Sequence, residues 1–170
     1  METTLKEIKP EKIGDNTFKL IGADWMLITA GTQDSFNTMT ANWGGLGYLW
    51  NKNVCFCFIR PPRYTYNFVE KTEIFTLSFF EEKYRDILKF CGANSGRDVN
   101  KIKKTGLIPV YSNSGAIYFE QARLALECKK IYFQDIISNN FIVSGIQTFY
   151  PKKDYHRMYI GEIVRCLAKE

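Results

Sequence analysis

The sequence lacks the marks of several common protein classes. Among 170 residues there is one histidine, His156, and the five cysteines contain no CxxC pair, so zinc ligands at the usual spacing are missing. No run approaches the roughly 18 to 20 apolar residues that cross a bilayer. Neither GxxxxGK[ST] nor GxGxxG after a strand occurs. We therefore expect no metal site, no membrane span, and no ATPase, kinase or Rossmann nucleotide site.

Cysteine usage and the first residues predict the compartment. An odd number of cysteines and a beginning (METTLKEIKPEKIG) without an apolar signal-peptide core indicate a reduced, cytoplasmic setting. Cys55 and Cys57 stand two apart in an apolar run. On a strand they face the same side, and burial as small hydrophobic residues is favoured over metal binding.

Composition indicates one folded domain over residues 1–170. Hydrophobic residues make up 45% and aromatic residues 15% of the chain, enough apolar area for a core. The net charge of +5 mildly favours anionic partners. The basic stretch Lys101–Lys104 is interpreted as a solvated helical face in preference to a nucleic-acid site.

Hydrophobic periodicity and turn residues predict an α+β, mainly β fold. No alternating βαβ units are visible, and a closed or partly closed antiparallel barrel solves the problem of exposed strand edges. We expect the glycines at 44, 45 and 47 to loosen the backbone, and Ser95 or Asp98 to cap the last helix. The expected helices are 64–71, 81–90 and one through 99–103; the expected strands are 25–29, 38–43, 54–59, 73–80, 118–129, 131–136, 141–149 and 155–167.

The stretch NTMTANWGG (37–45) has the residue types of a site for a planar ligand. Asn37, Met39 and Trp43 share one parity of a strand, and Thr38 and Thr40 share the other. An indole beside paired glycines lets a flat molecule approach the backbone. The alternative, an edge hairpin whose tryptophan packs in the core, is equally compatible with these residues.

The stretch RPPRYT (60–65) combines two arginines, a rigid Pro-Pro turn and a hydroxyl at a predicted helix start. A helix N-terminus and a guanidinium both suit phosphate oxygens. A capping Thr65 beside two solvated arginines is the alternative.

Two further stretches are weaker signals by themselves. CGANSGRDVNKIKK (91–104) is a polar, glycine-containing loop that enters a basic helix, and His156 stands at the start of the last predicted strand. A lone histidine is more often structural than catalytic, and no partner motif supports a hydrolytic triad.

These four stretches, NTMTANW, RPPRYTYNFVEK, CGANSGRDVNK and HRMYIGEIV, stand in an order that resembles the flavin reductase-like family with its FMN-binding split barrel, especially flavoredoxin-type members. The resemblance covers roughly residues 25–167. It implies a Greek-key-like split β-barrel with a few short helices, FMN as cofactor and a homodimer.

The resemblance also implies roles for particular side chains. The segment around NTMTANW would line the isoalloxazine ring and ribityl chain, RPPRYT the phosphate, and the lysine and histidine would approach the flavin. The residues so assigned are Asn37, Thr38, Met39, Thr40, Trp43, Arg60, Arg63, Tyr64, Thr65, Lys101 and His156; no protein side chain is assigned as a catalytic acid or base.

The activity implied is NAD(P)H:flavin oxidoreduction, with hydride passing from NADH or NADPH to the flavin. Electrons would leave with released flavin or pass to a protein acceptor. Two alternatives stay open: a flavoredoxin-like FMN electron carrier, and a non-enzymatic split-barrel module that binds flavin or haem. A nucleic-acid-binding barrel is supported only by charge and aromatic content and is not expected.

Overall fold

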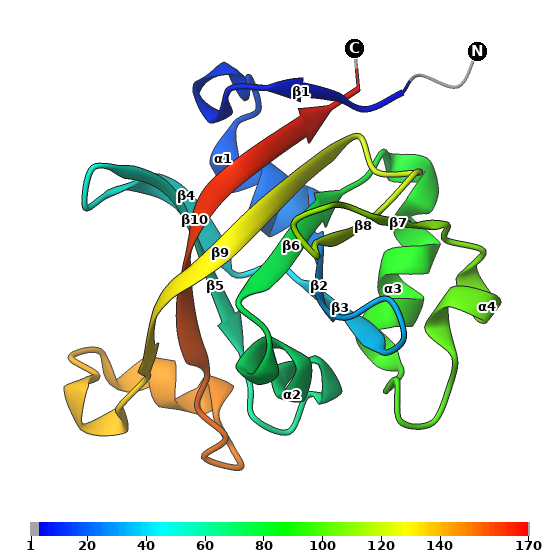
Figure 1. Ribbon diagram of the computed structural model, residues 1–170. Helices are drawn as coiled ribbons and strands as arrows, with labels where there is room; N and C mark the ends of the chain where they lie inside the picture. Colours follow the sequence, from blue (N-terminus) through cyan, green and yellow to red (C-terminus); the bar gives the residue numbers. More distant parts are fainter. Residues whose placement is uncertain (1–3, 170) are drawn as a thin grey trace.

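The computed structural model describes residues 4–169 and is built on one large, wholly antiparallel sheet (Figure 1). Its hydrogen-bonded order is β3-β2-β6-β9-β10-β5-β4, with β1 paired to β10, and β7 and β8 form a separate two-stranded sheet. The strands are β1 (Lys6–Ile8), β2 (Met26–Gly31), β3 (Phe36–Ala41), β4 (Gly44–Leu49), β5 (Lys52–Ile59), β6 (Ile74–Phe79), β7 (Pro109–Tyr111), β8 (Ile117–Phe119), β9 (Leu124–Asp135) and β10 (Arg157–Ala168).

The helices are short and lie between strands. Four α-helices are described: α1 (Thr17–Lys19), α2 (Tyr64–Lys71), α3 (Arg85–Ala93) and α4 (Lys101–Thr105). The remaining turns are the π-helical η2 (Leu20–Asp24) and the 3-10 helices η1 (Pro10–Lys12), η3 (Glu82–Tyr84), η4 (Ser138–Asn140) and η5 (Ser144–Phe149). Across residues 4–169, none of the helices is long and apolar enough to pass through a membrane.

A two-residue link closes the sheet into a barrel at one corner. Strands β3 and β4 lie at opposite ends of the sheet order, yet only Asn42 and Trp43 separate Ala41 from Gly44. The two edges must therefore meet at this corner, so the sheet curls on itself. The predicted mainly β, antiparallel barrel with a few short helices is confirmed, and Trp43 lies where its two edges meet.

The barrel interior is apolar and includes most of the cysteines. Cys55, Cys57, Cys128 and Cys166 are buried with large side chains from β2, β5, β6, β9 and β10. The predicted burial of Cys55 and Cys57 on the same side of β5 is confirmed. A second cluster, which includes Leu88 and Cys91 of α3, lies between this helix and the sheet.

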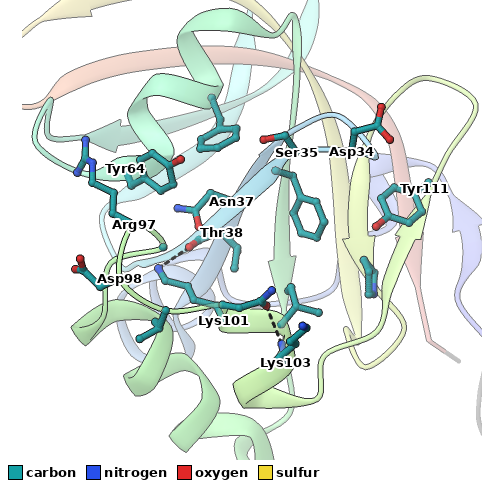
Figure 2. Close-up of a pocket in the computed structure, with 17 residues that line it drawn as sticks. Asp34, Ser35, Asn37, Thr38, Tyr64, Arg97, Asp98, Lys101, Lys103 and Tyr111 are labelled. Atoms are coloured by element: carbon teal, nitrogen blue, oxygen red, sulfur yellow. Dashed lines mark hydrogen bonds between the residues drawn. The ribbon is translucent and has the colours of Figure 1, made fainter.

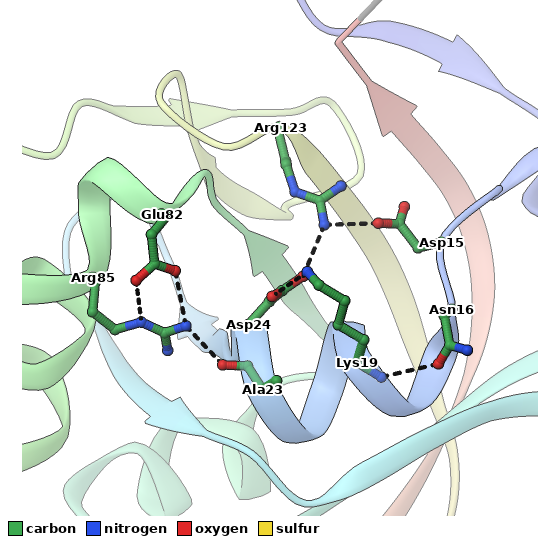
Figure 3. A network of polar contacts seen from close by, with 8 residues as sticks. All are labelled: Asp15, Asn16, Lys19, Ala23, Asp24, Glu82, Arg85 and Arg123. Atoms are coloured by element: carbon green, nitrogen blue, oxygen red, sulfur yellow. Dashed lines mark hydrogen bonds and ion pairs between the residues drawn. The ribbon is translucent and has the colours of Figure 1, made fainter.

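Charged side chains connect the N-terminal segment to the rest of the fold (Figure 3). Arg123 pairs with Asp15 and Asp24, and Lys19 pairs with Asp24. Arg85 at the start of α3 pairs with Glu82 and donates a hydrogen bond to the Ala23 carbonyl. These contacts hold residues 15–24, for which the sequence predicted no element, against α3 and the chain around Arg123.

Several predicted elements are correct. Helix α2 has the predicted bounds, β2, β3, β5, β6 and β10 match within a few residues, and Gly106 ends α4 in the left-handed region (φ 70°). The cap of α4 is Asn100, whose side chain accepts from the Lys103 amide, so the predicted caps Ser95 and Asp98 are wrong.

Two strand predictions, and the expectation for the glycines at 44, 45 and 47, are wrong. Residues 141–149 contain no strand: 144–149 form the 3-10 helix η5, Ile142 is 98% exposed, and no strand among residues 4–169 pairs with this excursion. The glycines near 44 do not loosen the chain: β4 pairs with β5. Finally, β9 runs unbroken through residue 130, and the turn lies earlier, at 120–123.

Candidate functional site

Two adjoining pockets lie at the closed corner of the barrel and meet at Met39 and Arg63. We call the first the Trp43 pocket, of about 190 Å³, and the second the α2 pocket, of about 210 Å³. The Trp43 pocket is lined by Met39, Thr40, Ala41, Asn42, Trp43, Phe58, Arg60, Arg63 and His156. The α2 pocket is lined by Asn37, Met39, Pro62, Arg63, Tyr64, Thr65, Gly92, Ala93, Asn94, Ser95, Gly96, Arg97 and Lys101.

Aromatic rings form one end of the Trp43 pocket. The Trp43 indole, 39% exposed, lies 5.0 Å from the His156 ring and 5.5 Å from the Phe149 ring, centroid to centroid. His156 is 9% exposed, and its Nδ1 is hydrogen-bonded to the Tyr150 hydroxyl at 2.9 Å. Flat side chains at an opening to solvent provide surfaces on which a planar ligand can stack.

The electrostatics of this pocket favour a neutral histidine. Burial and the neighbouring Arg60 lower the pKa of His156 to about 4, with Asp154 opposing in part. Arg60 is itself held by Asp154 at 3.1 Å and donates to the Phe149 carbonyl at 2.8 Å. The charge of Arg60 is thus largely compensated, whereas the imidazole carries none at neutral pH.

Arg63 supplies an uncompensated positive charge at the junction of the two pockets. It precedes α2 as the N-cap residue, and no side chain caps this helix start. Among residues 4–169, nothing accepts a hydrogen bond from its partly buried guanidinium or forms an ion pair with it. Burial, and then repulsion from Arg60, lowers its pKa. An unpaired cation beside free helical N–H groups is suited to an anion.

Asn37 joins three elements in the α2 pocket. Its Nδ2 donates to the Thr65 hydroxyl at 2.8 Å, so β3 is fixed to the first turn of α2. Gly96, in the loop after α3, packs directly on it: a Cβ added there would lie 2.1 Å from Asn37 Oδ1. This position therefore has no room for a side chain.

Lys101 differs from its sequence-based interpretation. The prediction of a solvated helical face over Lys101–Lys104 is wrong at its first residue, because Lys101 is 5% exposed. Its Nζ donates to the Thr38 carbonyl at 2.7 Å (Figure 2) and to the Cys91 carbonyl at 2.8 Å, which joins the edge strand β3 to α3. Burial, with a contribution from Arg63, lowers its pKa to about 8.

The fold brings together ten of the eleven residues predicted for the site. Asn37, Met39, Thr40, Trp43, Arg60, Arg63, Tyr64, Thr65, Lys101 and His156 all line one or both pockets. Thr38 lines neither pocket: its hydroxyl is turned inward and shares a 2.9 Å hydrogen bond with Thr29. Its carbonyl is at the free edge of β3, where Lys101 binds it.

Sequence reasoning missed the side chains that support Arg60 and His156. Tyr150, Asp154 and Phe149 come from the excursion between β9 and β10, which was predicted to contain a strand. No motif distinguishes them, and only the tertiary fold brings them to the pocket. Across residues 4–169, no group of three His, Cys, Asp or Glu side chains is placed to hold a metal ion.

Comparisons with known proteins identify the family and agree with the fold. A family model described as "Flavin reductase like domain" matches residues 18–170, whereas no curated protein matches the chain. An FMN-binding domain of a flavin reductase-like enzyme from Shewanella baltica has 18% identity and a TM-score of 0.72, over 99% of this chain and 79% of that one.

Two other solved structures are similar. Flavoredoxin of Desulfovibrio vulgaris has 23% identity and a TM-score of 0.67, over 96% of this chain and 77% of its own. An NADH:FAD oxidoreductase from Streptomyces globisporus, solved with NAD and FAD fragments, has 15% identity and a TM-score of 0.64, over 84% of this chain and 73% of that one. At these identities the likeness shows the fold.

Proposed function

The chain belongs to the flavin reductase-like domain family, and from this premise we propose that it binds FMN at the closed corner of the barrel and acts as an NAD(P)H-dependent flavin reductase. The observation that carries the proposal is the Arg63 guanidinium, partly buried and unpaired among the described residues at the uncapped start of α2. A terminal phosphate supplies the anion that this arrangement suits.

The residues present fit such a ligand along its whole length. Arg63 and the first turn of α2 would hold the phosphate, and Met39 and Thr40 would follow the ribityl chain along β3. The ring system would stack near Trp43 and His156. Strand β3 lies at the edge of the sheet, so the backbone N–H and C=O groups of every second residue point away from β2. Because Lys101 binds the Thr38 carbonyl from that side, these residues are Thr38 and Thr40. These amides could bond the polar edge of the ring.

Bound flavin would supply the hydride and electron chemistry, while the protein binds, orients and excludes water. His156, neutral at physiological pH, adds no charge beside the ring. Lys101, hydrogen-bonded to two carbonyls, lies next to Arg63 and supports the positive potential of the α2 pocket. No side chain need act as a general acid or base.

Flavin binding is tested by spectrum and titration. Purified protein should show the two-band flavin absorbance or acquire it with added FMN. Arg63→Ala should weaken FMN binding roughly tenfold to a hundredfold, as expected for loss of a charge-assisted hydrogen bond worth about 1.5–3 kcal/mol. Lys71→Ala, which removes an exposed charge at the other end of α2, serves as the control. An unchanged FMN dissociation constant for Arg63→Ala would remove this residue from the site.

An FMN electron carrier is the second candidate. The 39% exposure of Trp43 at the mouth of its pocket favours it, because an aromatic edge open to solvent can meet a protein acceptor. Steady-state oxidation of NADH and NADPH, with and without added flavin, separates the two: turnover supports the reductase. A flavin that nicotinamides do not bleach under anaerobic conditions supports the carrier.

A homodimer is part of the same proposal. The excursion beside the Trp43 pocket exposes Ile142, Val143, Ile146 and Phe149, and a grouped apolar surface of this kind is typical of an interface. The proposed partner for this surface is a second copy of the chain, which would also shield the ring end of the flavin site from water.

A further inference from the structure

The two ring nitrogens of His156 have different surroundings. Nδ1 is hydrogen-bonded at 2.9 Å to the hydroxyl of Tyr150, the residue that follows η5 and is 4% exposed. Nε2 has no hydrogen-bond partner among residues 4–169, yet it is not one of the buried polar atoms that lack a partner. Because the imidazole lines the Trp43 pocket beside Trp43 and Phe58, Nε2 is open to that pocket.

The bond to Tyr150 determines which nitrogen of His156 carries the proton. A neutral imidazole has one donor and one acceptor nitrogen, and the partner of one nitrogen decides the state of the other. Within residues 4–169, the phenol proton of Tyr150 has no acceptor other than Nδ1. If Nδ1 were protonated, two donors would face each other and the buried phenol proton would stay without an acceptor, which is unfavourable.

A second donor acts on the same phenol oxygen. Burial raises the pKa of Tyr150, whereas Arg60 and a hydrogen bond from the His156 backbone N–H oppose this rise. An oxygen that already accepts from a backbone amide is best completed by donating its own proton to Nδ1. Both observations give the same state of His156, with a bare Nδ1 and the proton on Nε2.

Ring contacts hold Tyr150 in position. The Arg60 guanidinium, which is paired with Asp154, lies over the Tyr150 ring at 5.1 Å from its centroid. The Phe141 ring stacks with it at 6.0 Å, and the Tyr155 ring lies 5.0 Å away, centroid to centroid. These contacts fix the hydroxyl against His156, and none of them depends on the hydroxyl itself.

We propose that Tyr150 is a positioning residue, which fixes His156 as the neutral imidazole with its proton on Nε2, a hydrogen-bond donor open to the Trp43 pocket. The electron density on the polar atoms of a flavin ring rises on reduction. A neutral donor at the ring end therefore favours the reduced flavin without adding a charge. This role rests on the proposed function, because the acceptor is the ring of the proposed FMN.

The first experiment determines the tautomer in the flavin-free protein. His156 is the only histidine in the chain, so labelling with ¹⁵N-histidine gives a single pair of ring-nitrogen signals by NMR. Protonated and bare nitrogens resonate far apart, and at neutral pH the wild type should show a protonated Nε2 and a bare Nδ1. Tyr150→Phe keeps the ring but removes the hydroxyl, so the two tautomers should mix and the two shifts should move toward each other.

Tyr155→Phe is the matched control. Tyr155 belongs to the same excursion and its ring also packs against Tyr150, but its hydroxyl is bonded to Gln147 and not to His156. Tyr155→Phe should therefore keep the wild-type tautomer of His156.

The second experiment measures the midpoint potential of bound FMN. Tyr150→Phe should weaken the binding of reduced FMN relative to oxidised FMN by up to about tenfold, which lowers the potential by up to about 30 mV for a two-electron couple. Tyr155→Phe should leave the potential unchanged. In a His156→Gln background, Tyr150→Phe should cause no further shift, because Tyr150 acts through the imidazole.

A wild-type spectrum with the proton on Nδ1 would overturn the proposal, and this spectrum decides the question even if Tyr150→Phe does not fold. An unchanged tautomer in Tyr150→Phe would overturn it as well, and so would an equal shift of potential with and without His156→Gln. A protein that binds no FMN would instead refute the proposed function, while the tautomer would still be determined without flavin, so the two failures are distinguishable.

Discussion

Replacement of Gly96 by alanine tests the packing at the centre of the candidate site. An added Cβ would lie 2.1 Å from Asn37 Oδ1, 2.8 Å from Asn37 Cγ and 3.1 Å from Tyr64 Cδ1. Ordinary contacts of a Cβ begin near 3.4 Å, so the loop or the Asn37 side chain must move by about 1.3 Å. Rotation of Asn37 would break its hydrogen bond to Thr65.

The expected cost follows from these two effects. Overpacking at a closely packed position costs about 1–3 kcal/mol. If Asn37 rotates to make room, the loss of its buried hydrogen bond costs about 1 kcal/mol. We therefore expect Gly96→Ala to lower the free energy of unfolding by roughly 1–3 kcal/mol. FMN binding should weaken as well, because β3 and α2 would no longer be joined through Asn37.

Urea denaturation and FMN titration measure the two quantities. Gly22→Ala is the control: Gly22 lies in the η2 turn, and an added Cβ there would meet nothing within 4 Å. This control should be neutral or slightly stabilising, since alanine favours helical backbone over glycine. If Gly96→Ala matched Gly22→Ala in both stability and FMN affinity, the inferred contact between the loop and Asn37 would be refuted.

Three further predictions concern protonation and assembly. The pKa of Lys101 is lowered to about 8 in the fold, so between pH 8 and 10.5 this lysine is protonated in the unfolded chain but not in the folded protein. The free energy of unfolding should therefore rise with pH in that range, by about 1 kcal/mol per pH unit. In urea titrations Lys101→Met should lack that rise. His156 has a pKa of about 4 in the fold, so between pH 6.5 and 4 it is protonated in the unfolded chain first and the stability should fall as the pH drops. In thermal unfolding, His156→Gln should lose less stability over this range than the wild type. Equal losses for the two proteins would contradict the lowered pKa of His156. Ile142→Asp places a charge on a side chain that is 98% exposed, so light scattering should report a monomer if this surface joins two copies, and an unchanged dimer would exclude it.

Local sequence signals predicted much of the fold and the site. The Pro-Pro pair followed by an apolar-periodic segment indicated α2 at its observed bounds, and alternation in NTMTANW indicated the edge strand that carries Asn37 and Met39. The residue types alone suggested a phosphate end and a ring end. The resemblance of the four stretches to the flavin reductase-like family predicted eleven positions, and ten of them line the two pockets.

Other features depended on contacts between distant parts of the chain. The strand predicted at 141–149 followed β propensity, which has no effect where no neighbouring strand is available to pair. The charge pattern predicted that Lys101 lies on a solvated helical face. In the structure it is 5% exposed, and its Nζ donates to the Thr38 carbonyl of β3. Asp154 and Tyr150 carried no motif, and they act only through Arg60 and His156.

The sequence by itself determined the mainly β class, the buried cysteines and the types of side chain that face the proposed ligand, because alternation, turn residues and hydrophobicity are local properties. The tertiary structure decided which of these side chains meet. The two-residue link at Asn42 and Trp43 brings the sheet edges together, so the positions of Trp43, Arg63 and His156 relative to one another follow from barrel closure. The tertiary structure also decided which charges are paired: Asp154 compensates Arg60, whereas Arg63 has no acidic partner among residues 4–169.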